Sequence, residues 1–156
     1  MRGHCYDAIV GLAGCDKSLP GMMMAMVRLN TPSVFIYGGS ILPGRAPMGA
    51  KVPEDFANRD LTVQDMFEAV GRQQNGSMSE AELEILERVA CPSAGACGGQ
   101  FTANTMACVS EAIGLALMNS SGAPAPYESR DQYSKASGEA VMNLSLIHIS
   151  EPTRPL

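Results

Sequence analysis

The sequence predicts an α/β fold, a fragment of a parallel-sheet domain with flanking helices and long loops. Two short apolar runs, residues 7–13 and 33–37, show no polar alternation, which is typical of strands buried on both faces of a parallel sheet. The segment between them, residues 19–29, is rich in Met, Ala and Leu, which are strong helix formers. Strand, helix and strand in this order predict a right-handed parallel crossover, with the helix on one face.

Capping and breaking residues set the expected ends of these elements. Ser18 is a candidate N-cap for the first helix, and Asn30 is a candidate stop. The prolines and glycines within residues 40–60 predict a long surface loop after the second strand.

Helical spacing of apolar residues predicts four more helices. Two polar pairs at the capping-box spacing open the first two, namely Thr62 with Asp65 and Ser79 with Glu82. We expect Gly71 and Gly76 to end the first of these, and Pro92 to end the second. A long helix is expected over residues 101–117, and a last one over residues 131–144. The apolar stripe of the long helix comprises Phe101, Met106, Val109, Ile113 and Leu117.

The last twelve residues do not continue this pattern. Over residues 145–156 the helical period stops without a cap, and the segment resembles a translated cloning or adapter tail. We therefore expect a partial native domain over residues 1–144 and a non-native tail over residues 145–156, and we assign His148 no function. A two-stranded sheet leaves unpaired edges, so we also expect the chain to be an internal piece of a larger protein.

Composition and charge exclude several classes of function. Hydrophobic residues make up 46% of the 156 residues, which is enough for a core. The net charge of −5, without a basic stripe, argues against nucleic-acid binding. No apolar run approaches the roughly 20 residues that a membrane span needs, and no signal peptide is recognisable. The odd number of cysteines, five, favours reduced or metal-bound thiols in the cytoplasm over a disulfide scaffold.

Two cysteines share one local setting. Cys15 follows the first strand and precedes a helix, and Cys97, followed by two glycines, also precedes a helix. Free N–H groups and partial positive charge at a helix start stabilise a thiolate, and soft thiolates bind iron–sulfur clusters or zinc. The alternative is that both are small buried hydrophobic residues, because the spacing of Cys91 and Cys97 matches no common metal motif.

Asp16 and Lys17 follow Cys15 directly and form a second candidate site. An ammonium is disfavoured at a helix start, and a neutral amine can react with carbon dioxide to give a carbamate. Together with the Asp16 carboxylate, that oxygen ligand would make half of a magnesium site. The alternative is a solvated surface ion pair.

The remaining cysteines carry weaker signals. Cys91 precedes Pro92 and is interpreted as structural, Cys108 as a packing residue, and Cys5 as inert. A non-enzymatic metal-binding domain that uses Cys15, Cys91 and Cys97, for example with zinc, stays open as a different class of function.

Two long segments resemble the signature blocks of the dihydroxy-acid/phosphogluconate dehydratase family. Residues 14–25 read GCDKSLPGMMMA and residues 90–106 read ACPSAGACGGQFTANTM, and residues 37–44, YGGSILPG, are similar as well. The resemblance covers residues 3–144, and within the family it is strongest to the dihydroxy-acid dehydratases of branched-chain amino-acid synthesis. Two long motifs in order are far more specific than one short pattern.

The resemblance implies a hydro-lyase that converts a 2,3-dihydroxy acid into a 2-keto acid. It implies that Cys15 and Cys97 are two of three thiolate ligands of an iron–sulfur cluster, either [2Fe–2S] or [4Fe–4S]. It further implies that Asp16 binds Mg²⁺ and that Lys17 is its carbamylated ligand. The third cysteine, the remaining carboxylates and the serine base of the family lie outside this chain, so we expect the chain alone to be inactive.

The resemblance also implies partners. We expect a small dihydroxy acid as substrate, a homodimeric parent protein, and neither nucleic acid nor membrane as a partner. A sugar acid or phosphogluconate is the alternative substrate within the family.

Overall fold

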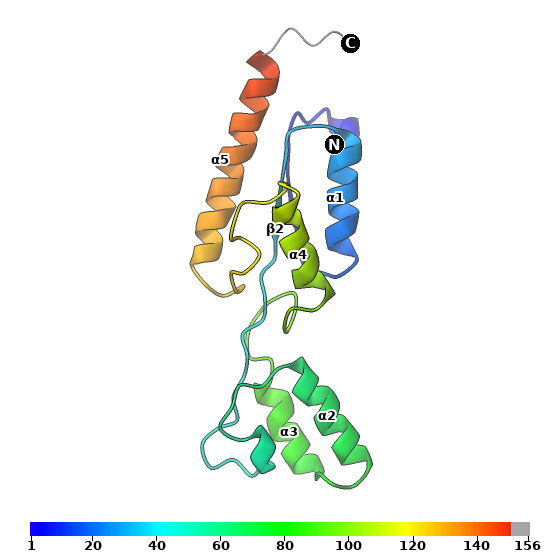
Figure 1. The fold of residues 1–156 in the computed structure, drawn as a ribbon, viewed down its shortest axis with the longest axis vertical. Coiled ribbons are helices and arrows are strands. Elements are labelled where there is room, and N and C mark those ends of the chain that lie inside the picture. Colours follow the sequence, from blue (N-terminus) through cyan, green and yellow to red (C-terminus); the bar gives the residue numbers. More distant parts are fainter. Residues whose placement is uncertain (151–156) are drawn as a thin grey trace.

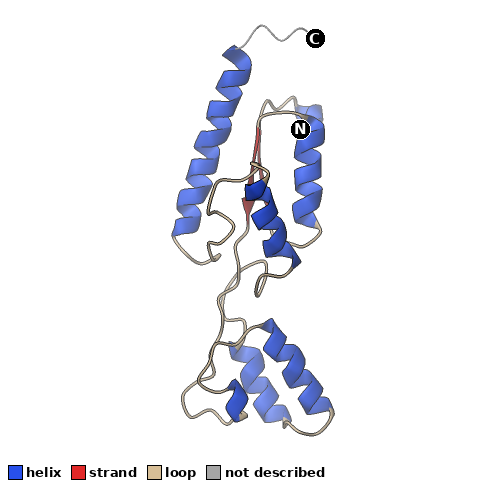
Figure 2. Ribbon diagram, in the orientation of Figure 1, coloured by secondary structure: helices blue, strands red, loops and turns tan. Residues whose placement is uncertain are grey.

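The computed structural model describes the backbone of residues 1–150 and the side chains of residues 1–147. Figure 1 shows an elongated molecule with two lobes. One lobe contains the sheet and the first, fourth and fifth α-helices, and the other contains two helices beside a short 3-10 turn, as the colouring by element in Figure 2 makes plain. Within the described residues, no helix is long and apolar enough to cross a membrane.

The predicted parallel crossover is confirmed. Strand β1 (Ile9–Ala13) pairs in parallel with β2 (Ser33–Tyr37), in the register Ile9 to Ser33 through Ala13 to Tyr37. Helix α1 (Ser18–Leu29) connects them and packs on one face of the sheet. The mixed α/β class that the sequence predicts is therefore the class observed.

The ends of α1 match the prediction in part. Asn30 ends the helix in the left-handed conformation, with a φ of 51°, and its N–H donates to the Met26 carbonyl. At the other end, Lys17 occupies the N-cap position and Ser18 is the first helical residue, so the expected cap at Ser18 is wrong by one residue. The Ser18 hydroxyl binds the backbone of Cys15 instead.

The two strands differ in burial. β2 is covered on both faces, because α1 and helix α4 (Thr102–Ala112) pack on one side and helix α5 (Ser129–Ser150) on the other. In β1, however, Val10 and Leu12 are 42% and 63% exposed. Burial on both faces is thus correct for β2 and wrong for β1, because α5 lies mainly over β2.

The second lobe has its own core. Helices α2 (Val63–Gln74) and α3 (Glu80–Val89) pack together, and the 3-10 turn η2 (Glu54–Phe56) places Phe56 against them. The buried members of this core are Phe56, Leu61, Ala69, Met78, Leu86 and Ala90. Residues 40–60 are therefore not only a surface loop, since Phe56 is 1% exposed. Both predicted capping boxes are present.

Three helix boundaries or faces differ from the prediction. α2 continues through Gly71. α4 ends at Ala112, before Gly114 with a φ of 76°, and buries small residues, namely Ala103, Asn104, Ala107 and Ser110. From the expected stripe, Phe101, Val109 and Ile113 are 39%, 37% and 59% exposed, because α4 packs against α1 through its small residues.

The last helix is longer than its apolar pattern indicates. α5 spans Ser129–Ser150, whereas the sequence predicts residues 131–144. The first part of the expected tail is therefore helical, and residues 151–156 lie outside the described residues. The non-native origin of residues 145–156 stays a prediction.

Two chain passages, residues 38–44 and 90–97, lie side by side where the lobes join (Figure 1). Three hydrogen bonds connect them: Ala96 N–H to the Gly39 carbonyl (2.8 Å), Ile41 N–H to the Cys97 carbonyl (2.8 Å), and Leu42 N–H to Ser93 Oγ (2.8 Å). Gly44 lies so close to the Val89 carbonyl that a Cβ at this position would overlap its oxygen. A side chain at Gly44 would force two backbone segments apart.

We expect Gly44→Ala to destabilise the fold by about 3 kcal/mol, because backbone cannot yield as a flexible side chain can. The matched control is Gly71→Ala, since Gly71 lies inside α2 with open space around it. This control should be neutral or stabilising by roughly 0.5–1 kcal/mol. Urea unfolding followed by circular dichroism measures both, and equal midpoints for the two variants would contradict the close approach.

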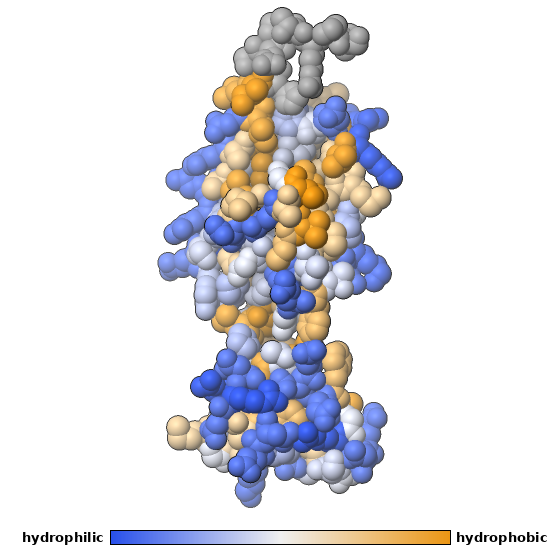
Figure 3. All heavy atoms as spheres, in the orientation of Figure 1, coloured by the Kyte–Doolittle hydropathy of each residue, from blue (hydrophilic) through white to orange (hydrophobic). Residues whose placement is uncertain are grey.

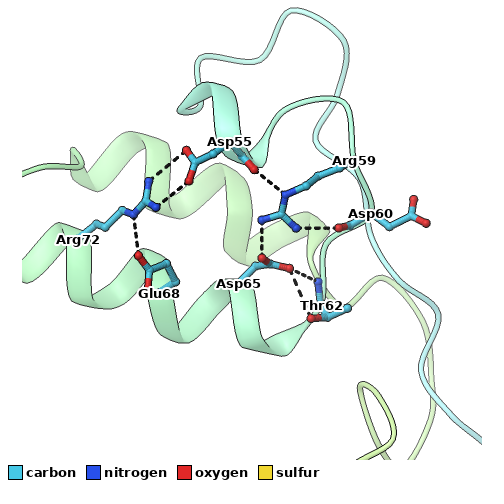
Figure 4. A network of polar contacts seen from close by, with 7 residues as sticks. All are labelled: Asp55, Arg59, Asp60, Thr62, Asp65, Glu68 and Arg72. Carbon is cyan, nitrogen blue, oxygen red and sulfur yellow. Dashed lines mark hydrogen bonds and ion pairs between the residues drawn. The ribbon is translucent and has the colours of Figure 1, made fainter.

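Charged side chains form a network of polar contacts on the second lobe (Figure 4). Arg59 donates to the Asp65 carboxylate at 2.6 Å, and Arg72 binds Asp55 at 2.7 Å and Glu68 at 3.0 Å. Both guanidinium groups also lie over the Phe56 ring, 5.5 and 4.9 Å from its centroid. The network therefore ties η2 to α2.

The hydrogen bond from Arg59, followed by that from the Thr62 N–H, holds the pKa of Asp65 below its ordinary value of 3.8. A lowered carboxyl pKa contributes stability above the unfolded pKa, which is lost as the pH falls through the folded pKa. We expect Arg59→Met to cost about 0.5 kcal/mol at pH 7, after solvent screening, and less near pH 2, where protonation of Asp65 weakens the ion pair but leaves the contact with Phe56. Urea unfolding at both pH values measures this difference. Arg45→Met is the control, because Arg45 pairs with Asp60 at a more exposed position. A cost of Arg59→Met that does not depend on pH would argue against a stabilising ion pair with Asp65.

Candidate functional site

Cys15 lies in the tight turn between β1 and α1. Its N–H donates to Ser18 Oγ at 3.0 Å, and the Ser18 hydroxyl donates back to the Cys15 carbonyl at 3.0 Å. The Leu19 N–H also donates to that carbonyl at 3.0 Å. The backbone of Cys15 is thus fixed from both sides, while its thiol is exposed.

Asp16 and Lys17 are brought together in the same turn. The Cys15 thiol donates to one Asp16 oxygen at 3.3 Å, and the Lys17 ammonium lies 3.2 Å from the other. The thiol first, and then the ammonium, hold the pKa of Asp16 below its usual value of 3.8. The Lys17 side chain is 92% exposed, so in this geometry the two residues form a solvated ion pair at a helix start.

Cys97 lies in a different environment, in the core of the first lobe. Its side chain is 8% exposed and belongs to the cluster that contains Ala13, Leu19 and Tyr37. A parallel bridge to Ser40 fixes its backbone beside the end of β2. One cysteine is therefore anchored in the core and the other faces water.

The turns that carry the two cysteines contact each other. A Cβ built on Gly14 would lie 3.1 Å from the Cβ of Ala96. Gly38, at the end of β2, lies between them, since a Cβ there would be 3.5 Å from the Gly14 Cα and 3.8 Å from the Ala96 Cβ. Cys15 and Cys97 each follow one of the contacting residues, so the fold brings both to the carboxyl end of the sheet.

The other cysteines lie elsewhere. Cys5 and Cys91 are exposed, and Cys108 lies half-buried within α4. Among the described residues, no three Cys, His, Asp or Glu side chains gather in a way that could hold a metal ion. A complete zinc site from Cys15, Cys91 and Cys97 is therefore not formed by this part of the chain.

Two buried polar residues near Cys97 were missed by the sequence analysis. The Tyr37 hydroxyl is buried and makes no hydrogen bond within the described residues, and burial raises the pKa of this phenol above 10.0. Asn104 is 9% exposed and donates to the Ser121 carbonyl at 2.8 Å. The available signals were a tyrosine before a Gly–Gly pair and an asparagine in the second signature block.

The residues around this junction define a class of protein. The chain belongs to the family of dihydroxy-acid/6-phosphogluconate dehydratase N-terminal domains, whose model matches residues 1–154. It is 78% identical to the dihydroxy-acid dehydratase of Dinoroseobacter shibae and 72% identical to that of Parvibaculum lavamentivorans. Each match covers 144 residues, which is 92% of this chain and 23% of the relative. The chain thus spans about a quarter of the length of the curated relatives it matches.

The donor set fits the chemistry of an iron–sulfur cluster in kind. Cys15 and Cys97 offer two soft thiol ligands on turns that contact each other. The Tyr37 hydroxyl, which has no hydrogen-bond partner among the described residues, lies in the core that holds Cys97. Asp16 offers a hard oxygen ligand on the exposed side. Such a site would need further ligands from outside the described residues, because no three donors gather within them.

The contact between the two turns predicts that Cys15 and Cys97 act as a close dithiol. In a variant with Cys5, Cys91 and Cys108 replaced by Ser, we expect phenylarsine oxide to bind one-to-one and protect both thiols from alkylation. Mass spectrometry of the alkylated peptides measures this. The control keeps Cys15 and Cys91 instead and should show no protection, whereas equal protection in both variants would refute the arrangement.

Proposed function

We propose that this chain is part of a dihydroxy-acid dehydratase, a hydro-lyase that converts a 2,3-dihydroxy acid into a 2-keto acid in branched-chain amino-acid biosynthesis. The observation that carries the proposal is the contact of Gly14 with Ala96, which brings the cysteines of both signature blocks to one end of the sheet. The names of the relatives support this substrate over phosphogluconate or another sugar acid. We place the enzyme in the cytoplasm, as a homodimer, with no nucleic-acid or membrane partner.

Cys15 and Cys97 would hold an iron–sulfur cluster, [2Fe–2S] or [4Fe–4S], with a third thiolate from outside the described residues. Cys97 provides the rigid side of the site, because the core around it excludes water and fixes its backbone. Cys15 provides the accessible side, where a substrate can approach. When bound, the cluster and Mg²⁺ would supply Lewis acidity toward the departing hydroxyl and the carboxylate of the acid.

Asp16 and Lys17 would hold Mg²⁺ beside this cluster. The Asp16 carboxylate can serve as an oxygen ligand, and the neighbouring thiol and ammonium hold its pKa below the usual value. Lys17 occupies the N-cap position of α1, where a negative group is favoured over a positive one. Reaction of its neutral amine with carbon dioxide gives a carbamate and releases a proton, which replaces the unfavourable charge with an oxygen ligand.

The test places this chain in a full-length enzyme, by exchange for the matching region of the Dinoroseobacter shibae dehydratase. After anaerobic reconstitution with iron and sulfide, we expect charge-transfer absorption and keto-acid formation. Cys15→Ser and Cys97→Ser should lose both, because each removes a thiolate ligand. Cys108→Ser is the matched control and should keep both.

The isolated chain should form no keto acid, since its described residues gather no complete ligand set. The resemblance also places the base outside this chain, and a positioned base is worth roughly 10²–10⁴ in rate. Colourless zinc uptake in place of iron would favour the non-enzymatic metal-binding domain. Turnover by the Cys97→Ser enzyme would overturn the proposed role of that cysteine.

A further inference from the structure

The open face of β1 carries large apolar side chains that nothing in the described chain covers. Val10 is 42% and Leu12 63% exposed, although both lie in the middle of a strand. A cavity of about 390 Å³ adjoins them; its lining comprises Val10, Leu12, Ile36, Gly38, Ala125, Arg130 and Ser134. Figure 3 shows more generally that hydrophobic residues gather on the visible face of the first lobe, whereas the visible face of the second lobe is mainly hydrophilic. Exposed apolar patches of this kind mark interaction surfaces.

Arg130, at the start of α5, lines the same cavity, and its charged side chain is buried. It is 7% exposed, and its Nη1 donates to the Ser120 carbonyl at 2.8 Å. Among the described residues it forms no ion pair with a carboxylate. A guanidinium stays charged and has five N–H donors, so a buried one without a counter-charge is costly.

The strand β1 that carries this apolar face also forms an edge of the sheet. β2 is bounded on one side by β1 and on the other by residues 115–116, where the Phe35 N–H donates to the Leu115 carbonyl at 2.7 Å. β1 has only β2 as a strand partner in the described part of the chain. A strand edge beside an apolar face is a template for further chain.

We propose that the face formed by Val10, Leu12 and Arg130 is the docking surface for another segment of the longer dehydratase, an apolar segment whose Asp or Glu pairs with Arg130. This inference rests on the proposed function, in which the chain is one part of such an enzyme. The relatives contain further chain that could form this segment, because the present chain matches only 23% of their length. The missing counter-charge of Arg130 selects a segment with a carboxylate. A second copy bound across a twofold axis would instead bring a second uncompensated arginine to the surface.

The first experiment measures hydrogen exchange of the β1 amides in two unmodified proteins. These are the isolated chain and the natural Dinoroseobacter shibae enzyme. We expect exchange in the matching strand of the full-length enzyme to be slower by about tenfold or more, because docking closes the edge. Equal exchange in both would overturn the proposal, and this comparison requires no variant to fold.

Variants in the exchanged full-length enzyme test the side chains. Leu12→Lys should leave the unfolding temperature of the isolated chain unchanged, because the side chain already meets water, and should lower it by several degrees in the full-length protein. Arg130→Met should leave unchanged or stabilise the isolated chain but destabilise the full-length protein, where a carboxylate loses its partner. Met48→Lys, at a fully exposed second-lobe position, is the control.

The outcomes separate this proposal from the proposed function and from other occupants. Cluster absorption in the full-length protein with equal effects of Leu12→Lys in both contexts would leave the function standing and refute the docking surface. Absence of cluster absorption, together with effects of Leu12→Lys that differ between the isolated chain and the full-length protein, would refute the function and leave the docking surface standing. Leu12-dependent dimerisation of the isolated chain in size-exclusion chromatography would assign the face to a second copy. Arg130-dependent stabilisation by isovalerate would assign the cavity to a small acid, and either result overturns the proposal.

Discussion

The close approach of backbone segments at the junction of the lobes is the constraint on which the structure depends. Gly14 and Gly38 bring the ends of both strands against Ala96. The next residue, Gly39, adopts a φ of 92°, and the Ala125 nitrogen lies 2.7 Å from where its Cβ would be. Gly44 then passes the end of α3 at backbone contact. Gly39 and Gly44 leave no room for a side chain, and the contacts at Gly14 and Gly38 are close, so the two lobes and both cysteine turns are held in one arrangement.

Local patterns predicted the parts of the fold whose causes are local. The crossover follows from two apolar runs joined by a helix, and the capping boxes at Thr62 and Ser79 follow from hydrogen bonds within three residues. The exposure of Leu12 could not be predicted, because it depends on the placement of α5 far along the chain. The burial of Phe56 likewise depends on α2 and α3, which follow it in sequence.

In the candidate site, too, the sequence predicts the local features but not those that depend on distant parts of the chain. Cys15, Asp16, Lys17 and Cys97 were selected from two motifs, but neither motif alone indicates that their turns touch. That proximity arises from Gly14, Gly38 and Ala96, which carry no chemistry themselves. Tyr37 escaped selection because an aromatic residue at a strand end is usually a core residue; only its unpaired, buried hydroxyl distinguishes it.

The asymmetry of the two cysteines bears on how such a site can work. A ligand anchored like Cys97, in a core with fixed backbone, sets position, whereas a ligand like Cys15, on the exposed turn beside Asp16 and Lys17, leaves room for a substrate and for further ligands. The described residues cannot close the exposed side, because no three donors gather there. The apolar face of β1 and Arg130 line one cavity together with Gly38, which contacts both cysteine turns. Packing of further chain against that face would therefore bring additional groups to the side of the site that this chain leaves open.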